Sequence, residues 1–185
     1  MLVTLSETLN LGAPQEDVWR LLRDTGRLAS LLPGVENVTP SRPAPSSASA
    51  LASQAPVAAT TGGNSGAEEA YTARLTDKVG PFRLSLNLEV RVLEAAEPSL
   101  LRVALKGTDG GGANRVTGTL SAALKKAEPA GTVVSFDASV EVLGRLASLG
   151  AGPIRRRTQE RFAEFAGRFE QAVVQRGDAE ARSDT

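Results

Sequence analysis

The chain contains no cysteine and no histidine. It therefore has no disulfide, no thiolate nucleophile, no Cys/His zinc site and no Ser-His-Asp triad. The side chain that most often carries protons near neutral pH is also missing. A metal could bind only through hard oxygen ligands, and Asp109 has no second carboxylate at the spacing of a calcium-binding loop. We predict no metal site and no catalytic residue.

Aromatic residues, net charge and long hydrophobic runs are scarce as well. Aromatic residues make up 4% of the 185 residues and hydrophobic residues 41%, so the core must consist mainly of Leu, Val and Ala. The 21 basic residues balance the 21 acidic ones, which argues against broad electrostatic binding to nucleic acid. No signal peptide or apolar run of membrane-spanning length is present. Together with the absence of cysteine, this predicts a cytoplasmic protein.

Hydrophobic and polar residues alternate with a period of two in six segments. Short breaks containing Gly or Pro separate the later segments, which is typical of hairpins in an antiparallel sheet with one wet face. The alternating segments are residues 3–11, 71–75, 84–92, 101–105, 116–124 and 134–142.

Helical patterns follow the first strand and end the chain. Pro14 starts a short helix, and a second covers residues 25–31. The last helix has one apolar stripe and is expected to end at Gly177. Its stripe consists of Ile154, Thr158, Phe162, Phe165, Phe169 and Val173.

These elements predict an α+β fold. A curved antiparallel sheet of six to seven strands wraps around the long C-terminal helix, because the apolar stripe must be buried against the sheet. Such an arrangement often leaves an interior cavity. We expect one domain over residues 1–176, with a low-complexity insertion at 40–68 rich in Ala, Ser and Pro, and a disordered tail at 177–185.

Five short sequences in this order resemble the family of carbon monoxide dehydrogenase G subunits, within the START-like (SRPBCC) superfamily. They are Ala13-Pro14 with Val18-Trp19, Leu32-Pro33-Gly34-Val35, Val79-Gly80-Pro81-Phe82, the glycines Gly107, Gly110 to Gly112 and Gly118, and the run from Gly144 to Gly150. The resemblance spans residues 1–39 and 69–175. It implies a helix-grip fold with a cavity for a nonpolar ligand such as a lipid or quinone, and no covalently bound cofactor. It also implies an accessory role beside a molybdenum hydroxylase and peripheral contact with the inner membrane face.

The candidate ligand-binding residues are the large apolar side chains and one carboxylate. These side chains can also be ordinary core residues. The segment Leu31–Val35 can be either a lid hinge or a plain helix stop. Glu7 falls on the apolar face of the first strand, where it would bind a polar group of the ligand or serve as an acid. The alternatives are a strand bulge at Glu7 or a position near the sheet rim, where it meets solvent. The predicted cavity residues are Glu7, Trp19, Leu32, Pro33, Phe82, Phe136, Leu146, Leu149, Phe162, Phe165 and Phe169.

Arg155, Arg156 and Arg157 lie in the first turns of the last helix, where cations oppose the helix dipole. They are candidates for docking to a partner or to anionic lipid, or form a solvated helix start. The preferred function is a non-enzymatic binding protein. The alternatives are a polyketide cyclase- or dehydratase-like enzyme on the same fold, which would depend on Glu7, and a protein-interaction module.

Overall fold

The computed structural model describes residues 1–41 and 69–183. Within them the elements follow the predicted order, with one additional strand and a short 3-10 helix. The strands are β1 (Leu2–Leu11), β2 (Val35–Ser41), β3 (Ala70–Val79), β4 (Phe82–Ala96), β5 (Leu100–Asp109), β6 (Asn114–Ala127) and β7 (Gly131–Gly144). The helices are α1 (Gln15–Arg23), α2 (Thr25–Leu31), the 3-10 helix η2 (Arg145–Leu149) and α3 (Ala151–Ser183).

Two boundaries differ from the sequence prediction. Residues 40 and 41 belong to β2, and the rest of the predicted insertion at 40–68 lies outside the described residues. The expected end of the last helix at Gly177 is wrong, because α3 continues to Ser183. None of the helices in the described ranges combines the length and hydropathy needed to cross a membrane.

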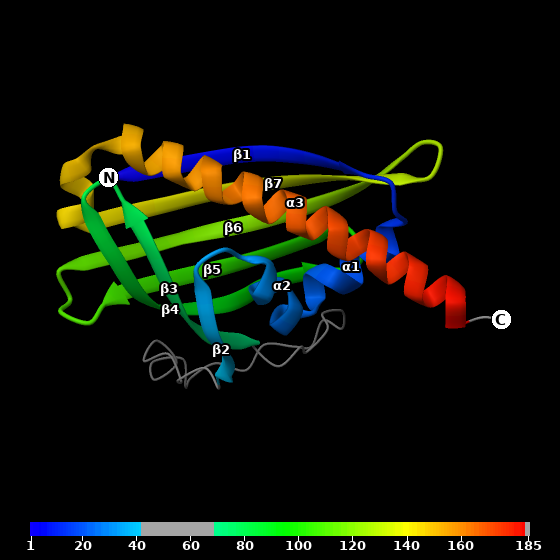
Figure 1. Ribbon diagram of the computed structural model, residues 1–185, viewed down its shortest axis with the longest axis horizontal. Coiled ribbons are helices and arrows are strands. Elements are labelled where there is room, and N and C mark those ends of the chain that lie inside the picture. The colour runs from blue at the N-terminus through cyan, green and yellow to red at the C-terminus, as the bar shows by residue number, and fades with distance from the viewer. Residues whose placement is uncertain (42–68, 184–185) are drawn as a thin grey trace, which may run out of the picture.

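All seven strands form one antiparallel sheet in the order β1-β7-β6-β5-β4-β3-β2. Short turns join the strands from β3 to β7, as the Gly and Pro breaks predict. The first strand, β1, pairs with the last strand, β7, and forms one edge of the sheet. Figure 1 shows β3 and β4 at a steep angle to β6 and β7, so the sheet is strongly curved, with α3 across its concave face. This arrangement confirms the predicted fold class.

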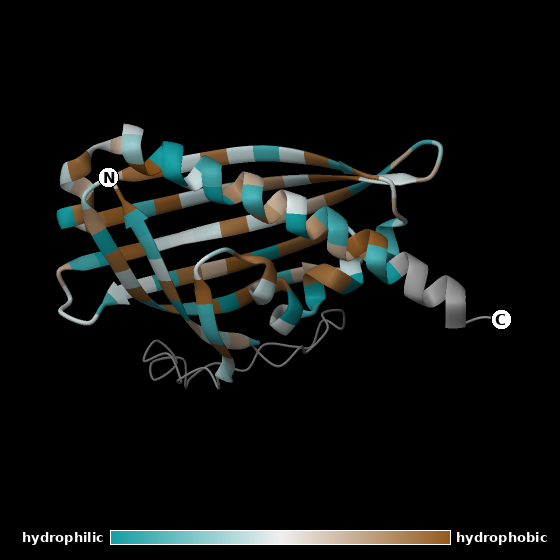
Figure 2. Cartoon of the chain, viewed as in Figure 1, coloured by the Kyte–Doolittle hydropathy of each residue, from teal (hydrophilic) through white to brown (hydrophobic). Residues whose placement is uncertain are grey.

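The alternating sequence determines which side chains face α3. In β4 the hydrophobic positions alternate with Arg83, Ser85 and Asn87, and the pairing with β3 keeps Leu86 beside Leu75. Figure 2 shows this alternation as brown and teal bands along the strands. Because side chains of a strand point alternately to its two faces, each strand contributes one apolar row to the concave side.

Helix α1 packs against one end of the sheet. Its apolar positions Val18, Trp19 and Leu21 are buried, while Glu16 lies in the first turn, where a negative charge complements the helix dipole. Gln15 is buried too, and its Nε2 donates to the carbonyl oxygens of Pro98 at 3.0 Å and Leu124 at 3.3 Å. These hydrogen bonds attach the start of α1 to β6 and to the β4–β5 turn.

We predict that Phe169→Ala lowers the free energy of unfolding by about 3–5 kcal/mol, because the Phe169 side chain is 0% exposed and its loss leaves a cavity. Urea unfolding followed by Trp19 fluorescence measures the change. Val174→Ala on the same helix is the control, since Val174 is 57% exposed and should change stability by less than about 0.5 kcal/mol. Equal losses in the two variants would contradict this assignment of the core.

Candidate functional site

The concave face of the sheet is defined by residues that lie side by side across neighbouring strands. Glu7 of β1 pairs with Phe136 of β7, which pairs in turn with Ala122 of β6. Ala122 belongs to the buried core, so this row faces α3. Two residues further along these strands, the next row that faces α3 contains Leu120 of β6, which pairs with Ala138 of β7.

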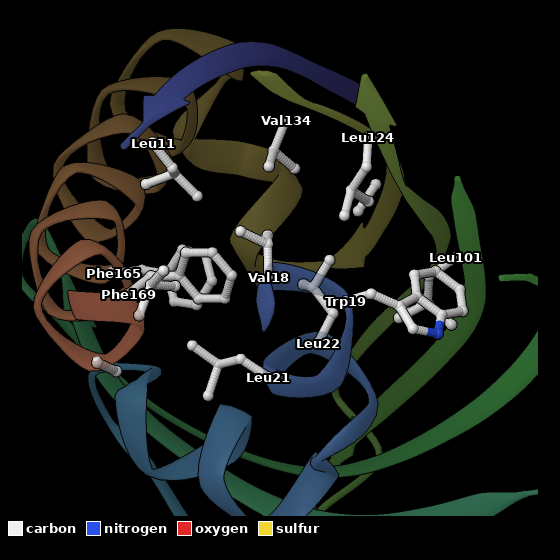
Figure 3. Close-up of a cluster of buried hydrophobic side chains, with 13 residues drawn as sticks. Leu11, Val18, Trp19, Leu21, Leu22, Leu101, Leu124, Val134, Phe165 and Phe169 are labelled. Atoms are coloured by element: carbon white, nitrogen blue, oxygen red, sulfur yellow. The ribbon is translucent and has the colours of Figure 1, made fainter. Parts of the chain in front are cut away.

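The fully buried side chains form two separate clusters on this face. The larger one joins α1, the second half of α3 and the adjacent ends of the strands. Figure 3 shows Trp19 beside Leu101 in this cluster and the rings of Phe165 and Phe169 close together. The smaller cluster, formed by Val3, Val142 and Leu146, lies near η2. The chain therefore packs tightly at both ends of the concave face.

Between these clusters the inward-pointing side chains are only partly buried. Leu120 is 37% exposed although its neighbour Ala122 on the same face is 6% exposed. The half-buried positions of the same rows are Leu5, Leu75, Leu88, Val90, Leu105, Ala138 and Val140. Space accessible to solvent therefore lies against an apolar surface in the middle of the concave face. We call this space the central hollow.

Four phenylalanines lie beside the hollow. The ring centroid of Phe136 is 5.5 Å from that of Phe162, 5.9 Å from Phe165 and 6.3 Å from Phe169, all with edge-on geometry. Edge-on pairs are favourable because the positive ring edge meets the negative face of its neighbour. Phe165 and Phe169 are buried, whereas Phe136 and Phe162 are half-buried. Phe136 and Phe162 therefore lie at the boundary between the buried core and the central hollow.

An ion cluster joins the first half of α3 to β3, which lies towards the opposite edge of the sheet from β7. Asp77 lies on the same face of β3 as Leu75, and its side chain is 10% exposed. The Nη2 atoms of Arg157 and Arg161 donate to its Oδ1 at 2.7 and 2.6 Å. Because α3 also contacts β1, the helix is attached to strands on both sides of the curved sheet.

The charges of this cluster stabilise one another. Burial alone would raise the pKa of Asp77, but hydrogen bonds from Arg161 and Arg157 and from the Lys78 amide lower it from 3.8 to about 2. The hydrogen bonds with Asp77 raise the pKa of Arg157 above its ordinary value. Arg157 also donates to Glu160 at 3.1 Å, so it is held at both ends of its guanidinium group. All of these groups stay charged at neutral pH.

The structure brings together some of the predicted cavity residues and separates others. Phe136 and Phe162 lie beside the hollow, and Glu7 is half-buried in the same row as Phe136. Within the described part of the chain, no hydrogen bond or ion pair involves the Glu7 carboxylate. Phe165 and Phe169 form the adjoining core, and Trp19 is buried at the α1 end.

The remaining predicted cavity residues lie around the periphery. Leu146 belongs to the smaller cluster, and Leu149 packs against it. Phe82 is 41% exposed at the start of β4, and no ring contact joins it to the other phenylalanines of the described residues. In the turn after α2, Leu32 is 39% exposed and Pro33 is buried.

The turn after α2 is held closely against β3. The amide of Thr76 donates to the Gly34 carbonyl at 2.8 Å, and a side chain at Gly34 would collide with the Thr76 carbonyl. Gly34 also has a φ of 83°, which favours glycine. A hinge at residues 31–35 stays a prediction.

The basic start of α3 divides into two parts. Arg155 and Arg156 are exposed, and Arg156 pairs with Glu160 at 3.2 Å. Arg157 turns inward to Asp77. Sequence patterns could not assign this role, because Asp77 lies 80 residues earlier in the chain. The one available signal was the position of Asp77 on the inward parity of Tyr71, Ala73 and Leu75.

A second depression lies on the outer face of the sheet, over β3, β4 and β5. It measures about 640 Å³, and its lining includes Asn37, Arg74, Asn87, Glu89 and Lys106. Its polar and charged lining suits a nonpolar ligand less well than the central hollow does. Within residues 1–41 and 69–183, no three acidic side chains gather in a way that would hold a metal ion.

Comparison with solved structures places this architecture in a known class. A conserved protein from Geobacillus kaustophilus is 15% identical, with a TM-score of 0.71, and the match covers 94% of this chain and 96% of that one. A START superfamily protein from Mycobacterium smegmatis is 15% identical, with a TM-score of 0.57 and coverage of 93% and 97%. The Zhui aromatase/cyclase from Streptomyces sp. R1128 is 11% identical, with a TM-score of 0.58 and coverage of 95% and 96%. The chain thus has the START-like helix-grip fold.

The sequence itself matches the CoxG family, which is described as the G subunit of carbon monoxide dehydrogenase, over residues 60–174. The protein belongs to this family. No curated protein matches the chain.

We predict that Asp77→Asn destabilises the protein by about 1–2 kcal/mol at pH 7, because it leaves the Arg157 and Arg161 charges without their common partner. The folded pKa of about 2 is below the ordinary 3.8, so this contribution is complete above pH 4 and is lost as the pH falls towards 2. Urea unfolding at several pH values should show the difference between wild type and variant shrinking over that range.

Asp137→Asn provides the matched control. Asp137 is an exposed carboxylate that accepts a hydrogen bond from Ser6 at 2.6 Å, and an asparagine oxygen can still accept it. We expect this change to alter stability by less than about 0.5 kcal/mol. A difference between wild type and Asp77→Asn that stays constant from pH 7 to pH 2 would contradict the assigned ion cluster.

Proposed function

We propose that the protein is a non-enzymatic carrier that binds a hydrophobic small molecule, lipid- or quinone-like, in the central hollow. The observation that carries this proposal is the partial exposure of inward-pointing apolar side chains, above all Leu120 at 37%. Exposed apolar surface inside a fold is unfavourable in water, and covering it contributes about 25 cal/mol for each Å² removed from solvent. A nonpolar ligand would supply that cover.

The composition supports binding rather than catalysis. With no histidine or cysteine in the chain, the usual acid–base and nucleophilic groups are missing. Any redox chemistry would belong to the bound molecule or to a partner. Family membership supports an accessory role beside a carbon monoxide dehydrogenase-type molybdenum hydroxylase.

Glu7 is the polar group best placed to orient a ligand. It is half-buried beside Phe136, and no described residue forms a hydrogen bond or an ion pair with its carboxylate. The same carboxylate supports a second candidate function, an enzyme of the polyketide cyclase type, because a START-like neighbour is an aromatase/cyclase. Turnover of a polyketide-type substrate that disappears in Glu7→Gln without loss of stability would favour the enzyme over the carrier.

The carrier is tested directly by mass spectrometry of organic extracts of the purified protein and by titration with a menaquinone analogue. We expect a co-purifying lipid or quinone, or saturable binding of the analogue. A protein that carries no extractable ligand and binds no analogue would contradict the proposal.

We further predict that Leu120→Trp abolishes this binding while the protein stays folded. The hollow has room beside Leu120, so the indole ring should fill the ligand's place at a cost below about 1 kcal/mol. Leu93→Trp is the control, because Leu93 is 54% exposed at the irregularity in β4 and should leave binding unchanged. A loss of stability well above about 3 kcal/mol in Leu120→Trp alone would instead indicate a filled core.

A further inference from the structure

Glu7 lies on the concave face of β1, beside the central hollow. Its partner across the ladder is Phe136, at the boundary of the hollow. Two residues before it on the same face, Leu5 pairs with Ala138, and Ala138 pairs with Leu120. The Glu7 position is therefore about 7 Å along the strand from the row that contains Leu120, the most exposed inward side chain of the hollow.

The carboxylate of Glu7 is left without a partner. Among the residues that the structure describes, none forms a hydrogen bond or an ion pair with it. Other carboxylates at inward positions of the sheet have partners, since Asp77 binds two arginines of α3 and Asp109 accepts from Asn114 at 2.7 Å. A half-buried carboxylate that has lost part of its hydration without gaining a hydrogen bond is unfavourable. A polar group of the ligand would supply the missing bond.

The chemistry of a carboxylate restricts which ligand group suits this place. An ionised carboxylate accepts hydrogen bonds and donates none. A hydroxyl group of the ligand would form a charge-assisted hydrogen bond with it, which is about twice as strong as a bond between neutral groups. A carbonyl or ether oxygen would instead place its lone pairs against the negative charge. Glu7 therefore favours a donor over an acceptor.

Tyr71 of β3 also presents a polar group to the concave face, but it does not discriminate in this way. It pairs with Val90 at an inward position, it is half-buried, and its hydroxyl forms no hydrogen bond with any described residue. A phenol hydroxyl both donates and accepts, so it suits a ligand hydroxyl and a ligand carbonyl alike. We therefore assign the selection of a donor to Glu7.

We infer that the ligand of the central hollow carries a hydroxyl group that donates a hydrogen bond to Glu7. This class comprises phenols, hydroquinones and long-chain alcohols, and molecules whose polar atoms are all carbonyl or ether oxygens are disfavoured. In a quinone-like ligand the reduced form has such a hydroxyl and the oxidised form lacks it, so the protein would bind the hydroquinone more tightly than the quinone. This inference rests on the proposed carrier function and specifies the polar group of its ligand.

The test compares para-octylphenol with para-octylanisole, which share one ring and one apolar chain and differ in a hydroxyl against a methyl ether. In calorimetric titrations of the full chain, wild type should bind the phenol roughly tenfold more tightly, because only the phenol donates to the carboxylate. Neither probe has to be kept reduced, so the comparison isolates the hydrogen bond.

Glu7→Leu should bind the two probes equally, or the more apolar ether more tightly. The new leucine continues the apolar row of Leu5 and Leu9, so the variant should stay folded, and an affinity for the ether no weaker than that of wild type would show that the hollow is intact. Glu141→Gln is the matched control, because Glu141 is an exposed carboxylate on the convex face of β7, and its removal should keep the preference for the phenol.

Each failure has its own signature. Equal binding of phenol and ether by wild type, or tighter binding of the ether, would overturn the inference and leave the carrier function intact. A preference for the phenol that survives in Glu7→Leu would also overturn it, since the hydroxyl would then donate to another group. Binding of neither probe would contradict the carrier function, and the inference would fall with it.

Discussion

Contact between Phe136 of β7 and three phenylalanines of α3 sets the position of the long helix over the sheet. Phe136 packs edge-on against the other three rings at centroid distances of 5.5–6.3 Å, and these rings are four of the five phenylalanines in the chain. The aromatic content is therefore concentrated at one contact. Because the half-buried positions in the middle of the concave face are Leu, Val and Ala, without further phenylalanines to fill the space, the middle of that face stays open.

The ion cluster around Asp77 complements this aromatic contact. The phenylalanines attach α3 to β7, and Arg157 and Arg161 attach its first half to β3. With these two contacts, α3 spans the concave face of the curved sheet from β7 to β3. Ion pairs replace apolar packing on the β3 side, so fewer apolar side chains enter the interior there. The central hollow follows from this division between aromatic packing on one side and charge pairing on the other.

Local sequence patterns were sufficient to predict most of the fold. The alternation in β4 to β7 and the stripe from Phe162 to Val173 depend only on the periods of strands and helices, and the structure confirms them. β2 escaped detection because Val35–Ser41 contains Pro40 and an irregularity near Asn37, which interrupt a period of two. The Asp77 cluster escaped because its members lie 80 and 84 residues apart. For the same reason, the sequence could mark the run of Arg155, Arg156 and Arg157 as unusual but could not identify Asp77 as the partner of Arg157.

Methyl NMR with labelled leucine and valine tests the central claim most directly, because it locates a nonpolar ligand on the concave or the convex face. During titration with a menaquinone analogue or palmitate, we expect saturable shifts for Leu75, Leu88, Leu105 and Leu120, which line the hollow. The exposed residues Leu93 and Leu143 should not shift. Shifts confined to those exposed leucines, or no saturable shift at all, would contradict the account.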